Sequence, residues 1–132
     1  MEKIVLPNGE VELINGNILF VKFEGNISDD DYKEIWETGV EKAVELNIEH
    51  FIFDQSRIGQ VSFKARGWVI LKMLPRIKKE LPAGLKIGVI SSKDLVNKSG
   101  VKYIVGMFEK MASLNINFFP DLDTAVAEVS SM

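Results

Sequence analysis

The chain has 132 residues, of which 46% are hydrophobic and 27% are charged, and its 16 basic and 19 acidic residues give a formal charge of -3. This composition fits one folded domain with a buried core, and it excludes a disordered chain. The acidic excess argues against a nucleic-acid-binding protein, and the absence of cysteine excludes disulfides and thiolate chemistry. No apolar run approaches the roughly 20 residues of a membrane-spanning helix, so we expect a cytoplasmic protein without membrane insertion.

The first part of the chain predicts a β-hairpin and a helix. Two apolar segments, 11–14 and 18–23, flank Asn15-Gly16, a pair that supplies the positive φ angles of a tight hairpin turn. Ser28 precedes three aspartates, which is typical of a capped helix N-terminus with acidic residues in its first turn. Apolar residues at helical spacing then predict a helix over 29–46.

The rest of the chain alternates strands with helices. The apolar run 48–53 predicts a strand buried on both faces, and Ser62 begins a helix that runs towards Glu80 with a kink at Pro75. We expect four further elements: a strand over 85–90, a helix over 93–114, a strand over 115–119 and a helix from 120 to about 129. The order ββαβαβαβα predicts a single α/β domain over 1–132, with a mostly parallel sheet, an N-terminal antiparallel hairpin and helices packed on the sheet.

Polar side chains follow two strands of this sheet. Asp54, Ser56 and Arg57 come directly after the central strand, and Ser91 follows the next strand. Because ligand and partner sites lie at the carboxyl ends of strands in open α/β sheets, we expect these residues to form one rim, with Trp68 nearby on the following helix. In the alternative interpretation, Asp54 accepts hydrogen bonds from its own loop and Arg57 is solvated or paired with an acid.

No pattern in the sequence predicts catalysis. Consecutive carboxylates at 29–31 point in directions about 100° apart on a helix, so capping explains them better than metal binding. His50 is the only histidine and has no histidine partner for a metal pair. Ser91-Ser92 lacks the glycines of a phosphate loop, so Ser92 is interpreted as a helix cap. We therefore expect no enzyme, no cofactor and no metal site.

The order of elements resembles the STAS fold of the SpoIIAA-like anti-sigma-factor antagonists. More narrowly, the chain resembles small stand-alone bacterial proteins grouped as STAS/SEC14-like. The residues that carry this resemblance are Asp54-Gln55-Ser56-Arg57, Trp68, Leu74-Pro75-Arg76, Asn117-Phe118-Phe119-Pro120-Asp121 and Ala125. The match spans about residues 10–130, and it implies a STAS-like domain that works as a non-enzymatic binding or regulatory module.

The chain departs from the family at the phosphorylated turn. Phosphorylated STAS antagonists carry an Asp-Ser-Ser-Gly-like turn at the start of the helix that follows the central strand. Here Ser62 stands close to that place, without the flanking Asp and Gly-Leu. A phosphate at a helix N-terminus is physically compatible, so the resemblance implies Ser62 as a candidate for phosphorylation.

Three functional hypotheses follow from the sequence. In the first, the surface from Asp54 to Trp68 binds a protein partner or a second copy of the chain, with a dimer favoured. In the second, the protein binds an apolar or anionic small molecule, as the SEC14-like resemblance implies. An enzyme comes third, because no pair of titratable groups has evident complementary roles.

Overall fold

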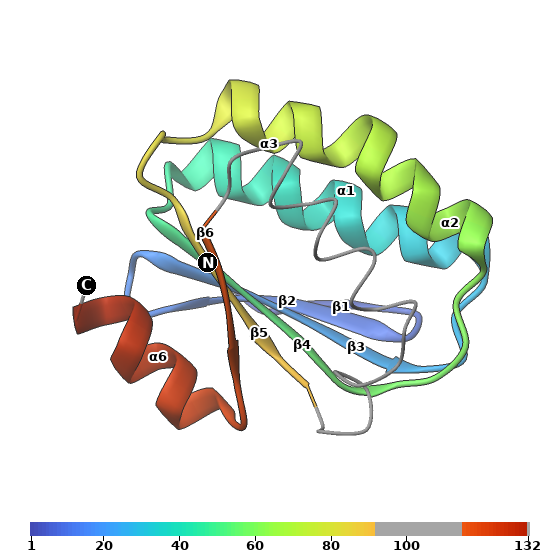
Figure 1. The fold of residues 1–132 in the computed structure, drawn as a ribbon, viewed down its shortest axis with the longest axis horizontal. Coiled ribbons are helices and arrows are strands. Elements are labelled where there is room, and N and C mark those ends of the chain that lie inside the picture. Colours follow the sequence, from blue (N-terminus) through green and yellow to red (C-terminus); the bar gives the residue numbers. More distant parts are fainter. Residues whose placement is uncertain (92–114, 132) are drawn as a thin grey trace.

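The structure is a computed structural model that describes residues 1–91 and 115–131. The described chain contains one mixed six-stranded sheet in the order β1-β2-β3-β4-β5-β6 (Figure 1). The first three strands are antiparallel and the remaining pairs are parallel, which confirms the predicted α/β fold with an N-terminal hairpin. The strands are β1 Ile4–Leu6, β2 Gly9–Ile14, β3 Ile18–Gly25, β4 His50–Ile58, β5 Lys86–Ile90 and β6 Asn115–Phe119. The helices are α1 Asp29–Leu46, α2 Phe63–Trp68, the π-helical turn η1 Val69–Met73, α3 Leu74–Glu80 and α6 Leu122–Ser131.

The N-terminal strands form a three-stranded meander. Asn15 and Gly16 have φ angles of 54° and 79°, which confirms the hairpin turn between β2 and β3. The sequence does not predict β1, because three residues are too few to show an alternating pattern. Its connection to β2 is nevertheless encoded: Asn8 follows Pro7 and has a φ of 63°, which fits a turn with proline first and a positive φ second.

The N-caps predicted at Ser28 and Ser62 are present. The Ser28 hydroxyl accepts a hydrogen bond of 3.2 Å from the Asp31 N–H at the start of α1. The Ser62 hydroxyl accepts one of 3.0 Å from the Ala65 N–H at the start of α2. Asn47 ends α1 in the left-handed conformation, with a φ of 53°, because this conformation satisfies the last carbonyl groups of the helix.

The helix predicted from Ser62 towards Glu80 departs from regular α-helical geometry just before Pro75. Proline has no N–H and its ring collides with the carbonyl group of the preceding turn. The chain relieves this conflict with η1, in which the Leu74 N–H bonds to the Val69 carbonyl, five residues back. α2, η1 and α3 therefore form one continuous helical rod with a single π-helical turn.

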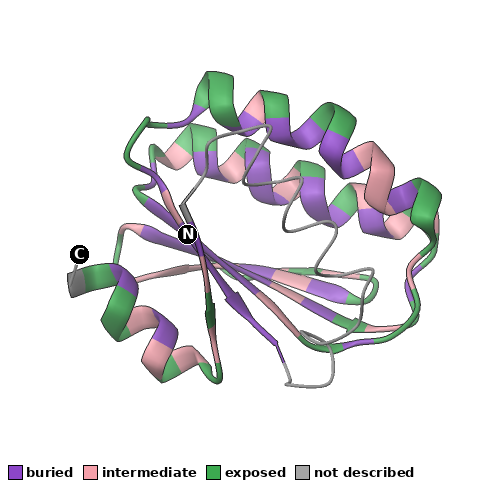
Figure 2. Ribbon diagram, in the orientation of Figure 1, coloured by how far each residue is buried: buried purple, intermediate pink, exposed green. Residues whose placement is uncertain are grey.

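The described helices lie on both faces of the sheet. α1, α2, η1 and α3 lie over one face, and α6 lies under part of the other (Figure 1). The buried residues of both layers face the sheet, as the purple bands in Figure 2 show. The larger core contains an aromatic cluster in which Phe53 stacks on Trp36 with ring centroids 4.7 Å apart and on Phe51 at 4.9 Å. Among the described helices, none is both long and apolar enough to cross a membrane.

Two predicted features lie outside the described residues. These are the helix over 93–114 and the capping role of Ser92. The last strand and helix agree with the prediction, and α6 begins after Asp121, whose carboxylate accepts a hydrogen bond of 2.8 Å from the Thr124 N–H. This bond and the one to the Thr124 side chain lower the pKa of Asp121.

Candidate functional site

The polar segment after the apolar part of β4 is strand and not the expected exit turn. β4 continues through Arg57 to Ile58, where it pairs with the end of β3. β5 stops pairing at Asp54, so the last part of β4 has a neighbour on one side only among the described strands. Between the pairs Lys22–Asp54 and Glu24–Arg57, β4 has one more residue than β3, which is a β-bulge. The sequence does not predict this part of β4 as strand, because its residues are polar. Among the described strands, it pairs with β3 alone.

Asp54 stabilises this bulge. Its Oδ1 atom accepts hydrogen bonds from the Ser56 N–H at 2.9 Å and from the Ser56 hydroxyl at 2.6 Å. This local bonding matches the structural interpretation of Asp54. Ser56 and Arg57 are exposed to solvent, and Arg57 forms no ion pair with any other described residue.

Ser91 lies next to this segment, directly after β5. Its neighbour Ile90 pairs with Asp54 in the parallel register, so the carboxyl ends of β4 and β5 meet as expected. The Ser91 hydroxyl is buried and has no hydrogen-bond partner among the described residues. The structure therefore brings Asp54, Ser56, Arg57 and Ser91 to the same end of the sheet.

Trp68 lies on a different side of the sheet from Asp54 and Arg57. Phe53 points into the core below α1 and α2, so alternation places Asp54 on the opposite face. Arg57 shares that opposite face because it is paired with Glu24, the neighbour of buried Phe23. Trp68 is instead half-buried against the helix-covered core. The Lys33 ammonium lies 5.5 Å from the centroid of its ring, a favourable cation–π contact.

The connection between β4 and α2 forms an exposed, well-supported surface. The Gly59 N–H donates to the Gly25 carbonyl at 2.8 Å, and the Gln60 N–H donates to the Asn26 side chain at 2.8 Å. Gly59 is required there because a Cβ would collide with the Asn26 side chain. At the end of this connection the Phe63 side chain is 78% exposed, which is unusual for an aromatic residue on a rigid frame.

Ser62 joins the starts of two helices. Its hydroxyl donates a hydrogen bond of 2.7 Å to the Asp29 carboxylate, in addition to capping α2. Asp30 and Asp31 lie in the same first turn of α1. A phosphate on Ser62 would therefore meet negative charge beside it, which opposes the favourable effect of the helix N-terminus.

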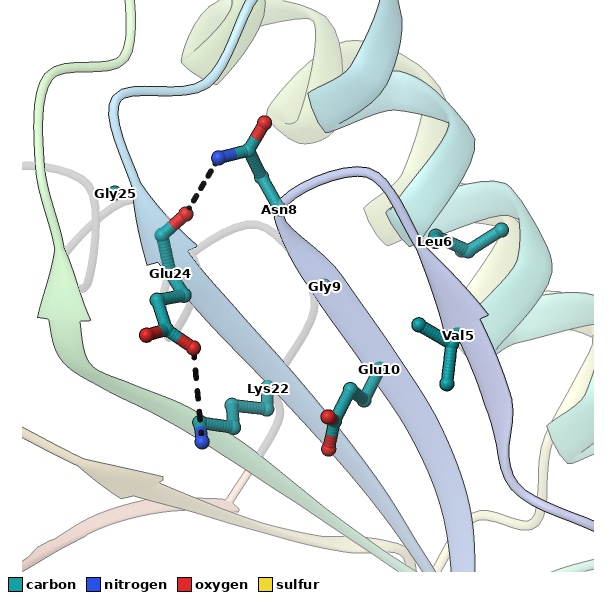
Figure 3. Close-up of a pocket in the computed structure, with 8 residues that line it drawn as sticks. All are labelled: Val5, Leu6, Asn8, Gly9, Glu10, Lys22, Glu24 and Gly25. Carbon is teal, nitrogen blue, oxygen red and sulfur yellow. Dashed lines mark hydrogen bonds and ion pairs between the residues drawn. The ribbon is translucent and has the colours of Figure 1, made fainter.

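The sequence does not single out the polar residues of the sheet face opposite α1. Glu10, Lys22 and Glu24 project from β2 and β3 around a pocket of about 430 Å³, in which the Lys22 ammonium lies 3.8 Å from the Glu24 carboxylate (Figure 3). Lys22 is paired in register with Asp54, so this pocket adjoins the polar segment of β4. A signal for these residues was present in the hairpin, where polar and apolar residues alternate. The apolar residues face the helices, so the polar residues lie on the opposite face of the sheet.

His50 is structural in character. It is the first residue of β4 and is buried, and burial lowers its pKa, with Glu49 raising it and Lys86 lowering it further. The Nδ1 atom has no hydrogen-bond partner in the described part of the chain. Within residues 1–91 and 115–131, no three acidic or histidine side chains lie together as metal ligands would.

Solved structures with the same arrangement of elements are SpoIIAA-like proteins. An uncharacterised protein of the DUF3478 family with a SpoIIAA-like fold, from Shewanella loihica PV-4, has a TM-score of 0.63 at 16% identity, covering 98% of both chains. An anti-sigma factor antagonist from Mycobacterium paratuberculosis has a TM-score of 0.62 at 20% identity, covering 92% of both chains. Unphosphorylated SpoIIAA, itself an anti-sigma factor antagonist, has a TM-score of 0.61 at 12% identity, covering 94% of this chain and 99% of its own.

Sequence comparisons add no closer relationship. No protein-family model matches the chain, and no curated protein matches it. The structural likeness covers nearly the whole chain at low identity, so it establishes the arrangement of helices and strands and leaves activity to be argued from the site. The chain has the SpoIIAA-like fold, as its resemblance to the STAS proteins implied.

Proposed function

We propose that the protein is a non-enzymatic, STAS-like binding module that acts through protein–protein contacts at the β4–α2 connection. The observation that carries this proposal is Phe63, whose side chain is 78% exposed at the end of a connection held by backbone and side-chain hydrogen bonds. A large apolar group on a rigid frame loses little conformational freedom on binding and gains burial. Arg57, exposed shortly before it in the chain, supplies a charged group of the kind found at interfaces.

Two features support a binding role over catalysis. The Asp54 carboxylate already accepts two hydrogen bonds from Ser56 within its own strand, an arrangement that holds the bulge in place. Anti-sigma factor antagonists occur among the proteins with this fold, which supports regulation through a protein partner by analogy. Trp68 contributes as a support beneath the surface, because it packs on the core and under Lys33.

The test compares two exposed apolar residues. The wild type, Phe63→Ser, Arg57→Ala and Leu71→Ser are immobilised, and proteins retained from a lysate of the source organism are identified by mass spectrometry. Leu71 is the matched control, because it is 68% exposed on η1, away from the connection. We expect a specific partner to be retained by the wild type and Leu71→Ser and to be lost in the other two variants, with all melting temperatures nearly equal. Equal retention by all four proteins would contradict the proposal.

A small-molecule ligand is the second candidate, and one observation favours it. The pocket of about 430 Å³ beside Glu10, Lys22 and Glu24 lies on the same sheet face as Asp54, and its volume is within the range of ligand sites. Native mass spectrometry of freshly purified protein separates the candidates. A bound molecule that is lost in Lys22→Ala would replace the protein-partner proposal.

A further inference from the structure

Opposite charges are separated onto two neighbouring helical rods. α1 contains seven acidic and two basic residues, whereas the rod from Phe63 to Glu80 contains six basic residues and one acidic residue. The formal charges of the two rods are therefore about equal in size and opposite in sign, although the whole chain carries only -3. None of these charged residues is buried, so the separation is not required by the core.

The outer side of α1 forms an acidic stripe, defined by Glu34, Glu37 and Glu41. All three are exposed, and their spacing of three and four residues places them on one side of the helix. None of them forms an ion pair with another described residue. Val44, one turn further on, is also exposed and adds apolar surface to the same side.

The outer side of η1 and α3 forms a basic stripe, defined by Lys72, Lys78 and Lys79. These lysines are exposed and likewise form no ion pair within the described chain. Leu71, which is 68% exposed, and Pro75 lie among them. The stripe therefore combines positive charge, unpaired within residues 1–91 and 115–131, with apolar surface, which is typical of a docking surface.

The two stripes overlap in height along neighbouring rods (Figure 1). The hydrogen bond between Asp29 and Ser62 joins the rod starts, and Lys33 lies over Trp68 further along both rods. Both rods contain the same number of residues. Counting from these two contacts, Glu37 is level with residues 70–72 and Glu41 with residues 74–76, because each residue advances along either rod by about 1.5 Å.

This arrangement is complementary to itself. A twofold axis that lies between the rods and parallel to them exchanges their positions while keeping their heights. α1 of one copy then lies over η1 and α3 of the other. Each acidic stripe therefore faces a basic stripe of the other copy, and the twofold axis repeats this contact once. We propose that these outer faces form a twofold-symmetric homodimer, in which Leu71 and Pro75 are buried between facing charges. The proposal goes beyond the proposed function, because it needs neither Arg57 nor Phe63.

The interface should be weak and sensitive to salt. Exposed ion pairs contribute little individually, but facing rows of opposite charge select the partner and its register. The apolar area between them is small, so most of the specificity is electrostatic. We expect the dissociation constant to rise about tenfold or more between roughly 20 mM and 300 mM salt, because screening shortens the range of these charges.

The decisive experiment reverses one stripe at a time. Sedimentation velocity at low salt compares the wild type with Glu37→Lys/Glu41→Lys and with Lys72→Glu/Lys79→Glu. Each variant alone should be monomeric, because its acidic stripe and its basic stripe then carry net charge of the same sign. An equimolar mixture should form heterodimers, because both stripes are then net basic in one variant and net acidic in the other. Glu2→Lys/Glu49→Lys is the matched control with the same change in charge at exposed positions outside both rods, and it should remain dimeric.

Three results would overturn the proposal. The wild type could be monomeric at low salt, the single-stripe variants could remain dimeric, or their mixture could fail to associate. Sedimentation with phosphatidylserine vesicles adds a further arm: a monomeric wild type that binds them only with Lys72 and Lys79 intact would assign the basic stripe to lipid instead. Phe63→Ser separates this inference from the proposed function, since it should lose the protein partner and keep the dimer.

Discussion

The two faces of the sheet differ in how the helices within residues 1–91 and 115–131 cover them. On the face below α1 and the rod from α2 to α3, side chains from both layers form one large core that includes Phe23, Trp36 and Phe53. On the opposite face, α6 covers a much smaller cluster around Ile52 and Val129. That face also carries Glu10, Lys22, Glu24 and Asp54.

The difference separates stability from recognition. The helix-covered face contains most of the apolar burial that stabilises the fold. On the opposite face, Glu10, Lys22 and Glu24 line a pocket of about 430 Å³. Exposed apolar groups such as Phe63 lie at the margins of the large core, where loss of the side chain leaves no cavity.

The largest effect should come from the large core. Phe53→Ala removes a ring that stacks on both Trp36 and Phe51. We expect the free energy of unfolding to fall by about 3–5 kcal/mol, because the cavity adds to the lost transfer free energy. Urea denaturation measures this loss, and a fall below about 1.5 kcal/mol would show that the aromatic cluster is loosely packed.

A smaller effect should come from the face under α6. Val129→Ala shortens a buried side chain in the small cluster. We expect a loss of about 2 kcal/mol in the same denaturation experiment, from two methyl groups and a small cavity. A loss equal to that of Phe53→Ala would mean that α6 contributes as much as the larger helical layer, and the comparison between the faces would be wrong.

The smallest effect should be a pH dependence from His50. Burial lowers the pKa of His50 in the folded protein, so the unfolded chain takes up a proton first as the pH falls. The stabilising contribution is therefore complete above about pH 6.5, the usual histidine pKa, and is lost as the pH falls from there through the folded-state value. In His50→Gln, the urea midpoint should therefore vary less with pH in this range. If the urea midpoint varied with pH equally in the wild type and in His50→Gln, other groups would be responsible for the pH dependence.

Elements with strong local signals could be predicted from the sequence. Asn15-Gly16, Ser28 and Asn47 each satisfy backbone groups or adopt backbone angles that few other residues favour, and the structure places each as expected. The end of β4 could not be predicted, because its pairing with β3 depends on a bulge and on contacts far away in the sequence. Local polarity at Asp54 to Arg57 indicated a loop, and tertiary pairing overrode it.

The candidate site was predicted only in part. Adjacent parallel strands bring Asp54 and Ser91 together, which follows from the topology. The separation of Arg57 from Trp68 depends on which sheet face each residue takes, and the bulge changes that alternation by one residue. No periodic pattern in the sequence predicts the exposure of Phe63, because this exposure depends on where the helices end against the sheet.

The π-helical turn at 69–73 has a consequence for how the sequence can change. A π-turn accommodates one residue more than the same turn of an α-helix. Deleting one residue there would restore regular helical geometry next to Pro75, whose ring and missing N–H that geometry does not accommodate. Natural variants that lack one residue in η1 should therefore also lack Pro75, so the extra residue and the proline should be gained or lost together.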